Sequence, residues 1–171
     1  MGKKRVLCSY GIDVDAVANW INTTDGTRQN PTNVSRGIFG ATVGIDRLLS
    51  LFSKYDIRAT WFCPAHSIES FPKQLAKVRD VGHELGLHGY THEYFSMMNE
   101  QQQRDVMVRS IEVLEKFTGV KPKGFTAPAW TTSKELIPLL QELGIEYDHS
   151  FMHHDVQPWV LTFLWRRLQS R

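Results

Sequence analysis

Hydrophobic positions along the chain follow two alternating spacings. Short runs of four to six residues, rich in branched and aromatic side chains, indicate buried strands. Between them, apolar residues recur three or four positions apart, the spacing of a helix that buries one side. The predicted strands cover residues 5–10, 59–63, 84–87, 124–127 and 145–147. The predicted helices cover residues 39–54, 72–82, 99–117 and 132–144.

Local signals mark several of the helix ends. Pro72 suits the first turn of a helix, and glycines at 82 and 144 end two helices. Asn99 is followed by Gln102 and Thr132 by Glu135, and both pairs resemble capping boxes. The polar segment 11–36 is long for a strand-to-helix connection, so we expect a functional loop there.

The order of elements predicts the fold class. Strands that alternate with helices form a parallel sheet with crossover helices. The pattern contains four strand–helix units and a fifth strand, whereas an eight-unit barrel takes about 250 residues. We therefore expect an α/β fold in the 171 residues, either an open sheet or part of a (β/α) barrel. No linker divides the chain, so residues 1–171 form one predicted domain, with a divergent tail at 160–171.

Composition narrows the class of protein. With 42% hydrophobic and 22% charged residues, the chain is neither disordered nor a coiled coil. A formal net charge of +2 argues against a nucleic-acid binder, and no apolar run approaches the roughly 20 residues of a membrane span. The start lacks the apolar core of a secretory signal, which predicts a cytoplasmic protein. Cys8 and Cys63 lie in predicted strands, where buried free thiols are expected.

Chemistry-bearing residues follow the predicted strands. The carboxyl ends of parallel strands meet at one edge of a sheet, where ligands bind. Asp13 and Asp15 follow the first strand, and His88 and His92 follow the third. Two histidines and one carboxylate with an open fourth position make a catalytic zinc site. A second carboxylate beside the site can take the proton of the attacking water.

Other residues at strand ends have weaker assignments. Trp130 is expected in the pocket wall, where its ring can stack on a sugar, and His66 is a candidate for lining the same pocket. Trp61 is expected in the core, and His83 is expected to cap the start of a strand.

Each part of the predicted metal site also has a structural interpretation. Asp13 and Asp15 could be turn residues or helix caps, which are common uses of aspartate. The spacing of His88 and His92 recurs by chance between His149 and His153. A second group, formed by His153 with the two residues that follow it, is interpreted as solvated surface.

Several motifs agree in order with a known family. They are YGIDVDAVANW, SRGIFG, TWFCPAHSIESFP, GHELGLHGYTHE, KPKGFTAPAW and EYDHSFMHHD. Over residues 5–159 the chain resembles the polysaccharide deacetylase superfamily (NodB homology, carbohydrate esterase family 4), and within it an intracellular peptidoglycan-deacetylase-like subgroup. The resemblance implies a distorted (β/α) barrel of the NodB type, here incomplete, and a divalent metal, usually zinc.

Matched positions carry the roles of the family onto this chain. The resemblance implies that Asp13 is the general base and that Asp15, His88 and His92 are the metal ligands. It further implies that a backbone N–H near Ala129 is an oxyanion donor.

The chain also departs from the family pattern. Val14 separates the two aspartates, as in the subgroup, and Thr126 stands where the family has an arginine that orients the base. The family draws its general-acid histidine from a late strand, and nothing after Asp155 matches that motif. We therefore expect a truncated product that lacks about the last third of the barrel and its general acid.

Three functions remain open on these grounds. The leading prediction is metal-dependent hydrolysis of a carbon–nitrogen bond, namely removal of an N-acetyl group from a peptidoglycan or chitin type of glycan. The first alternative is an amidohydrolase that acts on a small cyclic imide or ureide. The second is a catalytically inactive fragment that binds a metal or a partner. A truncated barrel leaves an open sheet edge, which would favour a homo-oligomer.

Overall fold

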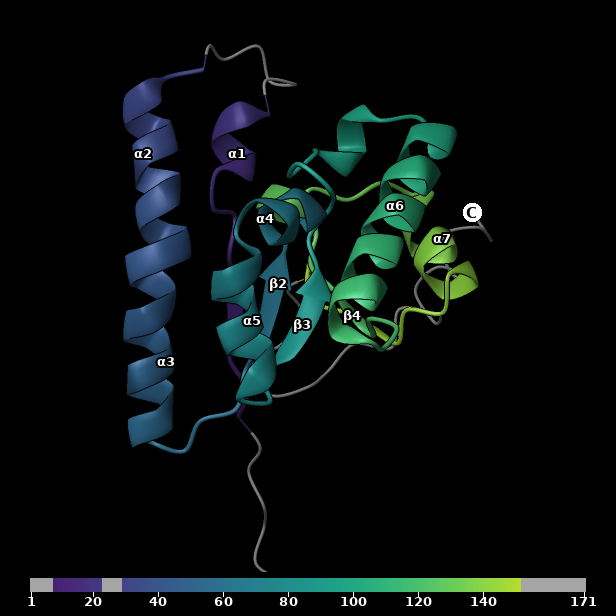
Figure 1. Cartoon of the computed structure of the whole chain (residues 1–171). Coiled ribbons are helices and arrows are strands. Elements are labelled where there is room, and N and C mark those ends of the chain that lie inside the picture. The colour runs from purple at the N-terminus through teal and green to yellow at the C-terminus, as the bar shows by residue number, and fades with distance from the viewer. Residues whose placement is uncertain (1–7, 23–28, 152–171) are drawn as a thin grey trace, which may run out of the picture.

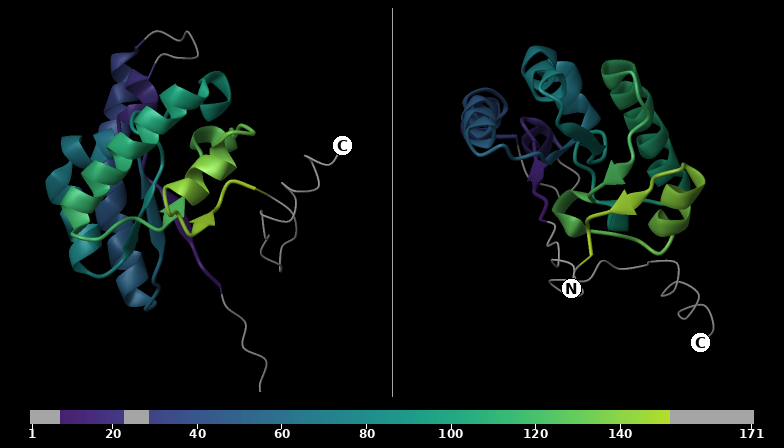
Figure 2. Two further views of the ribbon diagram at one scale, coloured as in Figure 1. Left: turned by 90° about the vertical axis from the view of Figure 1, so that its right-hand side faces the viewer. Right: turned by 90° about the horizontal axis from the view of Figure 1, so that it is seen from below.

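The computed structural model describes residues 8–22 and 29–151, and within them the chain builds one curved sheet (Figure 1). Its five parallel strands lie side by side in chain order. They are β1 (Gly11–Asp13), β2 (Thr60–Cys63), β3 (Glu84–Leu87), β4 (Gly124–Phe125) and β5 (Tyr147–Asp148). Seen from below in Figure 2, helices α2 to α6 lie around the outside of the curve. The predicted incomplete (β/α) barrel is thereby confirmed.

Helices connect the strands and cover the outer face of the sheet. Their bounds are α1 (Ala18–Ile21), α2 (Pro31–Phe39), η1 (Gly40–Gly44), α3 (Ile45–Lys54), α4 (Ala65–Ser70), α5 (Pro72–Asp80), η2 (Phe95–Met97), α6 (Glu100–Thr118), η3 (Pro128–Trp130) and α7 (Leu136–Glu142). Figure 1 shows α2 and α3 as one continuous column, joined through the π-helical turn η1. The predicted stripes are buried: Ile45 and Phe52 in α3, and Met107 and Leu114 in α6.

The first strand lies later in the chain than predicted. Residues 8–10 are not strand, Cys8 is exposed rather than buried, and pairing with β2 begins at Gly11. The alternation that defines this strand places apolar Ile12 and Val14 on one side and aspartates on the other. The predicted strand followed a continuous apolar run, which concealed this alternation. Cys63 is buried, as predicted.

The segment predicted as a long loop contains two helical elements. It holds α1, and α2 begins at Pro31, eight positions before the predicted helix. The Asn30 side chain caps α2 by accepting a hydrogen bond of 2.8 Å from the Thr32 N–H. Proline at the first helical position completes a start signal that the prediction missed.

Two capping predictions have different outcomes. The box at Asn99 and Gln102 is formed on both sides, and α6 follows it. The prediction of a capping box at Thr132 and Glu135 was wrong. Helix α7 begins at Leu136, and the Leu136 N–H donates a hydrogen bond of 3.1 Å to the Ser133 hydroxyl. Helix α4 was not predicted, and β5 begins two residues later than expected.

The two faces of the sheet differ in chemistry. The outer face carries apolar side chains such as Trp61, which is fully buried as predicted. On the inner face the Phe62 ring stacks on His149 at 5.7 Å and meets the Tyr147 ring edge-on at 6.5 Å. The Tyr147 hydroxyl donates to Glu84 Oε2 at 2.8 Å. Because Tyr147 on β5 reaches the β3 side chain over β4, the sheet is strongly curved and its concave side is polar.

Glycine in β3 leaves room for the Phe62 ring on the inner face. A Cβ built at Gly86 would lie 2.6 Å from Phe62, whose ring is 1% exposed and cannot move away. Gly86→Ala is therefore expected to lower the free energy of unfolding in urea by about 1–3 kcal/mol. Gly40→Ala is the matched control, because a Cβ there meets no atom within 4 Å and alanine favours a helix. Equal stability of the two variants would contradict the role given to Gly86.

Several predictions fall outside the described residues. They concern the tail at 160–171 and the cluster of His153, His154 and Asp155. Across residues 8–22 and 29–151, no helix has the length and apolarity needed to cross a membrane.

Candidate active site

Three of the predicted ligands meet at the carboxyl edge of the sheet. His88 Nε2 lies 3.4 Å from Asp15 Oδ1, and His92 Nε2 lies 3.6 Å from Asp15 Oδ2. One possible ligand atom from each of the three residues lies within 4.8 Å of the corresponding atoms of the other two. Both imidazoles are buried, with 2% and 6% of His88 and His92 exposed. The structure thus brings together side chains that are more than 70 residues apart.

The ends of two strands aim these side chains. The Val14 N–H donates to the Phe62 carbonyl at 2.8 Å, which continues the β1–β2 pairing to the residue before Asp15. The Ser67 hydroxyl then holds the Asp15 carbonyl at 2.7 Å. His88 directly follows β3 and continues its inner face, so its side chain projects above the concave side.

A backbone carbonyl fixes the tautomer of His88. Nδ1 of His88 lies 2.6 Å from the Thr126 carbonyl oxygen, which can only accept, so Nδ1 carries the proton. Nε2 is therefore the ring nitrogen that can bind a cation, and it lies 3.4 Å from Asp15 Oδ1. Such an outer hydrogen bond orients metal-binding histidines in general. Thr126, where the resemblance places an arginine, contributes its carbonyl here.

Electrostatics favour the metal-binding forms of these groups. Burial raises the pKa of Asp15, but the contact with His88 and the charges of His92 and His88 outweigh it, so the pKa lies below its ordinary value. Burial lowers the pKa of His92, and the charge of Asp15 opposes this only in part. An ionised carboxylate and a neutral imidazole are the states that bind a cation.

The donor set fits a divalent cation. Asp15 Oδ1 is buried and has no hydrogen-bond partner among the described residues, and His88 Nε2 faces it at 3.4 Å. His88 and His92 each face a different oxygen of Asp15, at 3.4 and 3.6 Å, and one ligand atom from each of the three residues lies within 4.8 Å of the other two, which is close enough for them to share one cation. Two imidazole nitrogens and one carboxylate oxygen leave a fourth position open, as in catalytic zinc sites.

Asp13 lies beside this cluster. Being two residues apart in extended chain, Asp13 and Asp15 point to the same side of β1. Both contribute to the lining of a cavity of about 320 Å³, but its other residues, such as Val14, Ile45 and Trp61, belong to the outer side of the sheet and to α3, and neither His88 nor His92 lines it. Asp13 is exposed, whereas Asp15 is partly buried. A solvent-accessible carboxylate next to the cluster is suited to accept a proton, and its role as the base stays a prediction.

The remaining predicted site residues lie at the same edge of the sheet but outside the cluster. Ala129 has a left-handed backbone with φ of 50° in η3, just after β4. Trp130 follows it and is 66% exposed. His66 lies in α4 after β2, where its N–H donates to the Tyr90 carbonyl at 2.9 Å. Their roles toward a substrate stay predictions.

Sequence reasoning missed the residues that support the ligands. Besides Thr126, Asn22 donates from its side chain to the His92 carbonyl at 2.9 Å. The Glu93 carboxylate accepts hydrogen bonds from the loop that carries both histidines. The position of Glu93 directly after the HGYTH motif was the one available signal, since a carboxylate there can bind preceding N–H groups.

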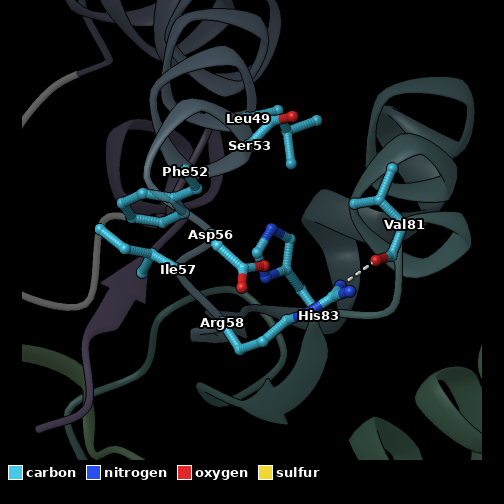
Figure 3. Close-up of a pocket in the computed structure, with 8 residues that line it drawn as sticks. All are labelled: Leu49, Phe52, Ser53, Asp56, Ile57, Arg58, Val81 and His83. Atoms are coloured by element: carbon cyan, nitrogen blue, oxygen red, sulfur yellow. Dashed lines mark hydrogen bonds between the residues drawn. The ribbon is translucent and has the colours of Figure 1, made fainter.

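A second pocket lies at the opposite edge of the sheet. It has a volume of about 180 Å³ and is lined by residues that precede β2 and β3, among them His83 and Arg58 (Figure 3). Arg58 donates to the Val81 carbonyl, and His83 Nδ1 accepts from the Ala59 N–H at 3.3 Å. His83 thus binds a backbone group at the start of a strand, as predicted, and lies away from the cluster of Asp15, His88 and His92.

His83 is expected to make stability sensitive to acid. Burial and then the charge of Arg58 lower its pKa, so the folded protein takes up this proton less readily than the unfolded chain. The contribution is fully present above the unfolded pKa of about 6.5 and is lost as pH falls below it. The drop in urea stability from pH 7.5 to 5.5 should therefore be smaller in His83→Gln than in wild type. An identical drop in both would show that His83 does not contribute.

The chain is similar in sequence and structure to known polysaccharide deacetylases. Residues 39–147 match the model of the polysaccharide deacetylase family. The chain is 46% identical over 156 residues to the peptidoglycan deacetylase of Helicobacter pylori, covering 91% of this chain and 53% of that protein. A crystal structure assigned as a polysaccharide deacetylase from Mycobacterium smegmatis superposes with a TM-score of 0.79 at 31% identity, over 84% of this chain and 50% of that one.

A second similar structure has a different named activity. The Puue allantoinase superposes with a TM-score of 0.72 at 25% identity, over 82% of this chain and 52% of that one. The chain thus spans about half the length of these relatives. Since the family model covers more than half of its residues, including His88 and His92, the chain belongs to the polysaccharide deacetylase family.

Proposed function

We propose that this protein is a metal-dependent hydrolase that removes the N-acetyl group from a glycan of the peptidoglycan or chitin type. The observation that carries the proposal is the convergence of Asp15, His88 and His92. Asp13, two residues before Asp15, is the carboxylate to which the proposal assigns the role of base. The family of the chain and its similarity to the H. pylori peptidoglycan deacetylase support an acetylated glycan as substrate.

Zinc is the metal that the proposal assigns to Asp15, His88 and His92. Two imidazole nitrogens and one carboxylate oxygen form a ligand set that zinc accepts in hydrolases, and the three residues bring one such atom each within 4.8 Å of the others. When bound, zinc would polarise the amide carbonyl and lower the pKa of the attacking water to around 7.

Three side chains and one backbone N–H of this protein have the remaining roles in the proposed reaction. Asp13 accepts the proton of the attacking water, because it is exposed and points to the same side as the ligands. The Ala129 N–H donates to the oxygen that becomes negative as water adds to the amide. Trp130 stacks on a sugar ring, and His66 contacts the substrate from the end of β2.

The second candidate substrate is a small cyclic imide or ureide. Similarity of the fold to an allantoinase favours it, since allantoin is a cyclic ureide. The same ligands and base serve either reaction, because both add water to a carbonyl carbon bound to nitrogen.

The test combines metal analysis with turnover. Purified protein should contain about one zinc per chain. It should release acetate from an N-acetylated chitooligosaccharide or a peptidoglycan fragment, and it should not open the ring of a cyclic imide. Turnover is measured with the 171-residue chain and with a chimera in which the second half of the H. pylori relative follows residue 151. Hydrolysis of the cyclic imide alone would favour the second candidate, and no turnover in the zinc-loaded chimera would contradict both.

A further inference from the structure

The loop from His88 to His92 has an unusual path. His92 has φ of 67° and Gly89 has φ of 71°, so the backbone turns sharply twice within five residues. This path brings the two imidazole centroids to 5.0 Å, with ring planes at 74°. Both rings reach Asp15 only because the loop doubles back, so whatever holds its curvature also sets the ligand geometry.

The Glu93 carboxylate occupies the inside of this curve. Its Oε2 accepts from the Tyr90 N–H at 2.9 Å, and its Oε1 accepts from the Thr91 N–H at 2.8 Å and from the Thr91 hydroxyl at 2.6 Å. A Cβ at Gly89 would lie 2.9 Å from Oε2, so the carboxylate and the loop are in close contact. One charged group therefore binds two consecutive backbone N–H groups of the loop.

The outward-facing groups of the loop have other partners. The carbonyls of Gly89 and Tyr90 accept from the N–H groups of Ala65 and His66 at 3.1 and 2.9 Å. The Tyr90 hydroxyl donates to the Glu69 carboxylate at 2.7 Å. These contacts tie the loop to α4, whereas the N–H groups on its inner side are bound by Glu93.

The two histidines depend on the loop to different degrees. His88 is held by β3 and by its own hydrogen bond to the Thr126 carbonyl. Nδ1 of His92 is buried and has no hydrogen-bond partner among the described residues. The orientation of the His92 ring is therefore set by the backbone that Glu93 and Asn22 hold.

We infer that Glu93 is a positioning residue of the metal centre, which acts by fixing the loop that aims His92 at Asp15. The inference rests on the proposed function only in taking Asp15, His88 and His92 as ligands. Removing the carboxylate leaves two partly buried loop N–H groups without their acceptor, and the loop is expected to relax away from the curve. Loss of such an outer contact typically weakens metal binding 10–100-fold.

Three glutamate variants test the inference. Glu93→Ala removes both carboxylate oxygens that accept hydrogen bonds from the loop, and Glu93→Gln keeps one acceptor, the amide oxygen. Glu112→Gln removes the same charge from an exposed position on α6. Zinc affinity is measured by competition with a chromophoric chelator, and ligand geometry by the visible absorption of the cobalt-substituted protein. Urea unfolding without metal reports on the fold.

Glu93→Ala should bind zinc about 10–100-fold more weakly and give an altered, less intense cobalt spectrum. Glu93→Gln should lie between it and wild type, and Glu112→Gln should match wild type. If Glu93→Ala does not fold, the Gln variant decides. Wild-type affinity and spectrum in the folded Glu93 variants would overturn the inference while leaving the proposed function intact. Zinc binding that depends on Glu93, without hydrolysis, would overturn only the function, and a wild type that binds no zinc would overturn both.

Discussion

Asp15→Ala is expected to abolish zinc binding at micromolar metal, with affinity lowered by more than about 100-fold. Asp15 supplies the single negative charge of the ligand set, and without it two neutral imidazoles remain. Wild type should gain about 2.7 kcal/mol of unfolding free energy when free zinc reaches 100 times its Kd, and the variant should gain almost none. Urea unfolding with and without zinc measures both.

The matched control for this variant is Asp80→Ala, an exposed aspartate on α5 that lies outside the cluster. It should keep the full zinc-dependent gain. If Asp15→Ala retained the wild-type gain, Asp15 would not be a ligand, and the enzymatic interpretation would lose its basis.

Asp13→Asn is expected to lower turnover by about 10²–10⁴ while leaving zinc binding unchanged. The amide keeps the size of the side chain but cannot accept the proton of the attacking water. Turnover of the chosen acetylated glycan is followed in the active form of the protein, and zinc content is measured on the same samples. Asp80→Asn serves as the control for the charge change and should retain turnover.

The two aspartate variants separate the two roles. A turnover near that of wild type in Asp13→Asn would remove Asp13 from the role of base. Loss of zinc from Asp13→Asn would instead show that Asp13 helps to hold the metal, either as a ligand or through its negative charge.

Much of the site was predictable from sequence because parallel strands bring their carboxyl ends to one edge. Asp15 after β1 and His88 after β3 had to meet there, whatever the details of the helices. Whether most segments form a helix or a strand was also predictable, because helices such as α3 and α6 bury regularly spaced apolar residues.

Features that depend on partners distant in sequence were not predictable. The first strand was placed too early because the prediction followed the continuous apolar run before Gly11 and overlooked the alternation of Ile12 and Val14 with the two aspartates. The hydrogen bond from His88 to the Thr126 carbonyl joins atoms 38 residues apart through a backbone group, which no side-chain pattern marks. The role of Glu93 depends on a loop path with a left-handed histidine, which is rare for residues other than glycine.

The strand order has a consequence for assembly during synthesis. Each strand pairs with the one that precedes it, so every new strand–helix unit finds its neighbour already made. Asp15, His88 and His92, the three proposed ligands, have all been synthesised by residue 92, before the residues of β4 follow. The Thr126 carbonyl that orients His88 is added later, so the nascent chain contains the proposed ligands first and the partner that fixes the orientation of His88 one unit later.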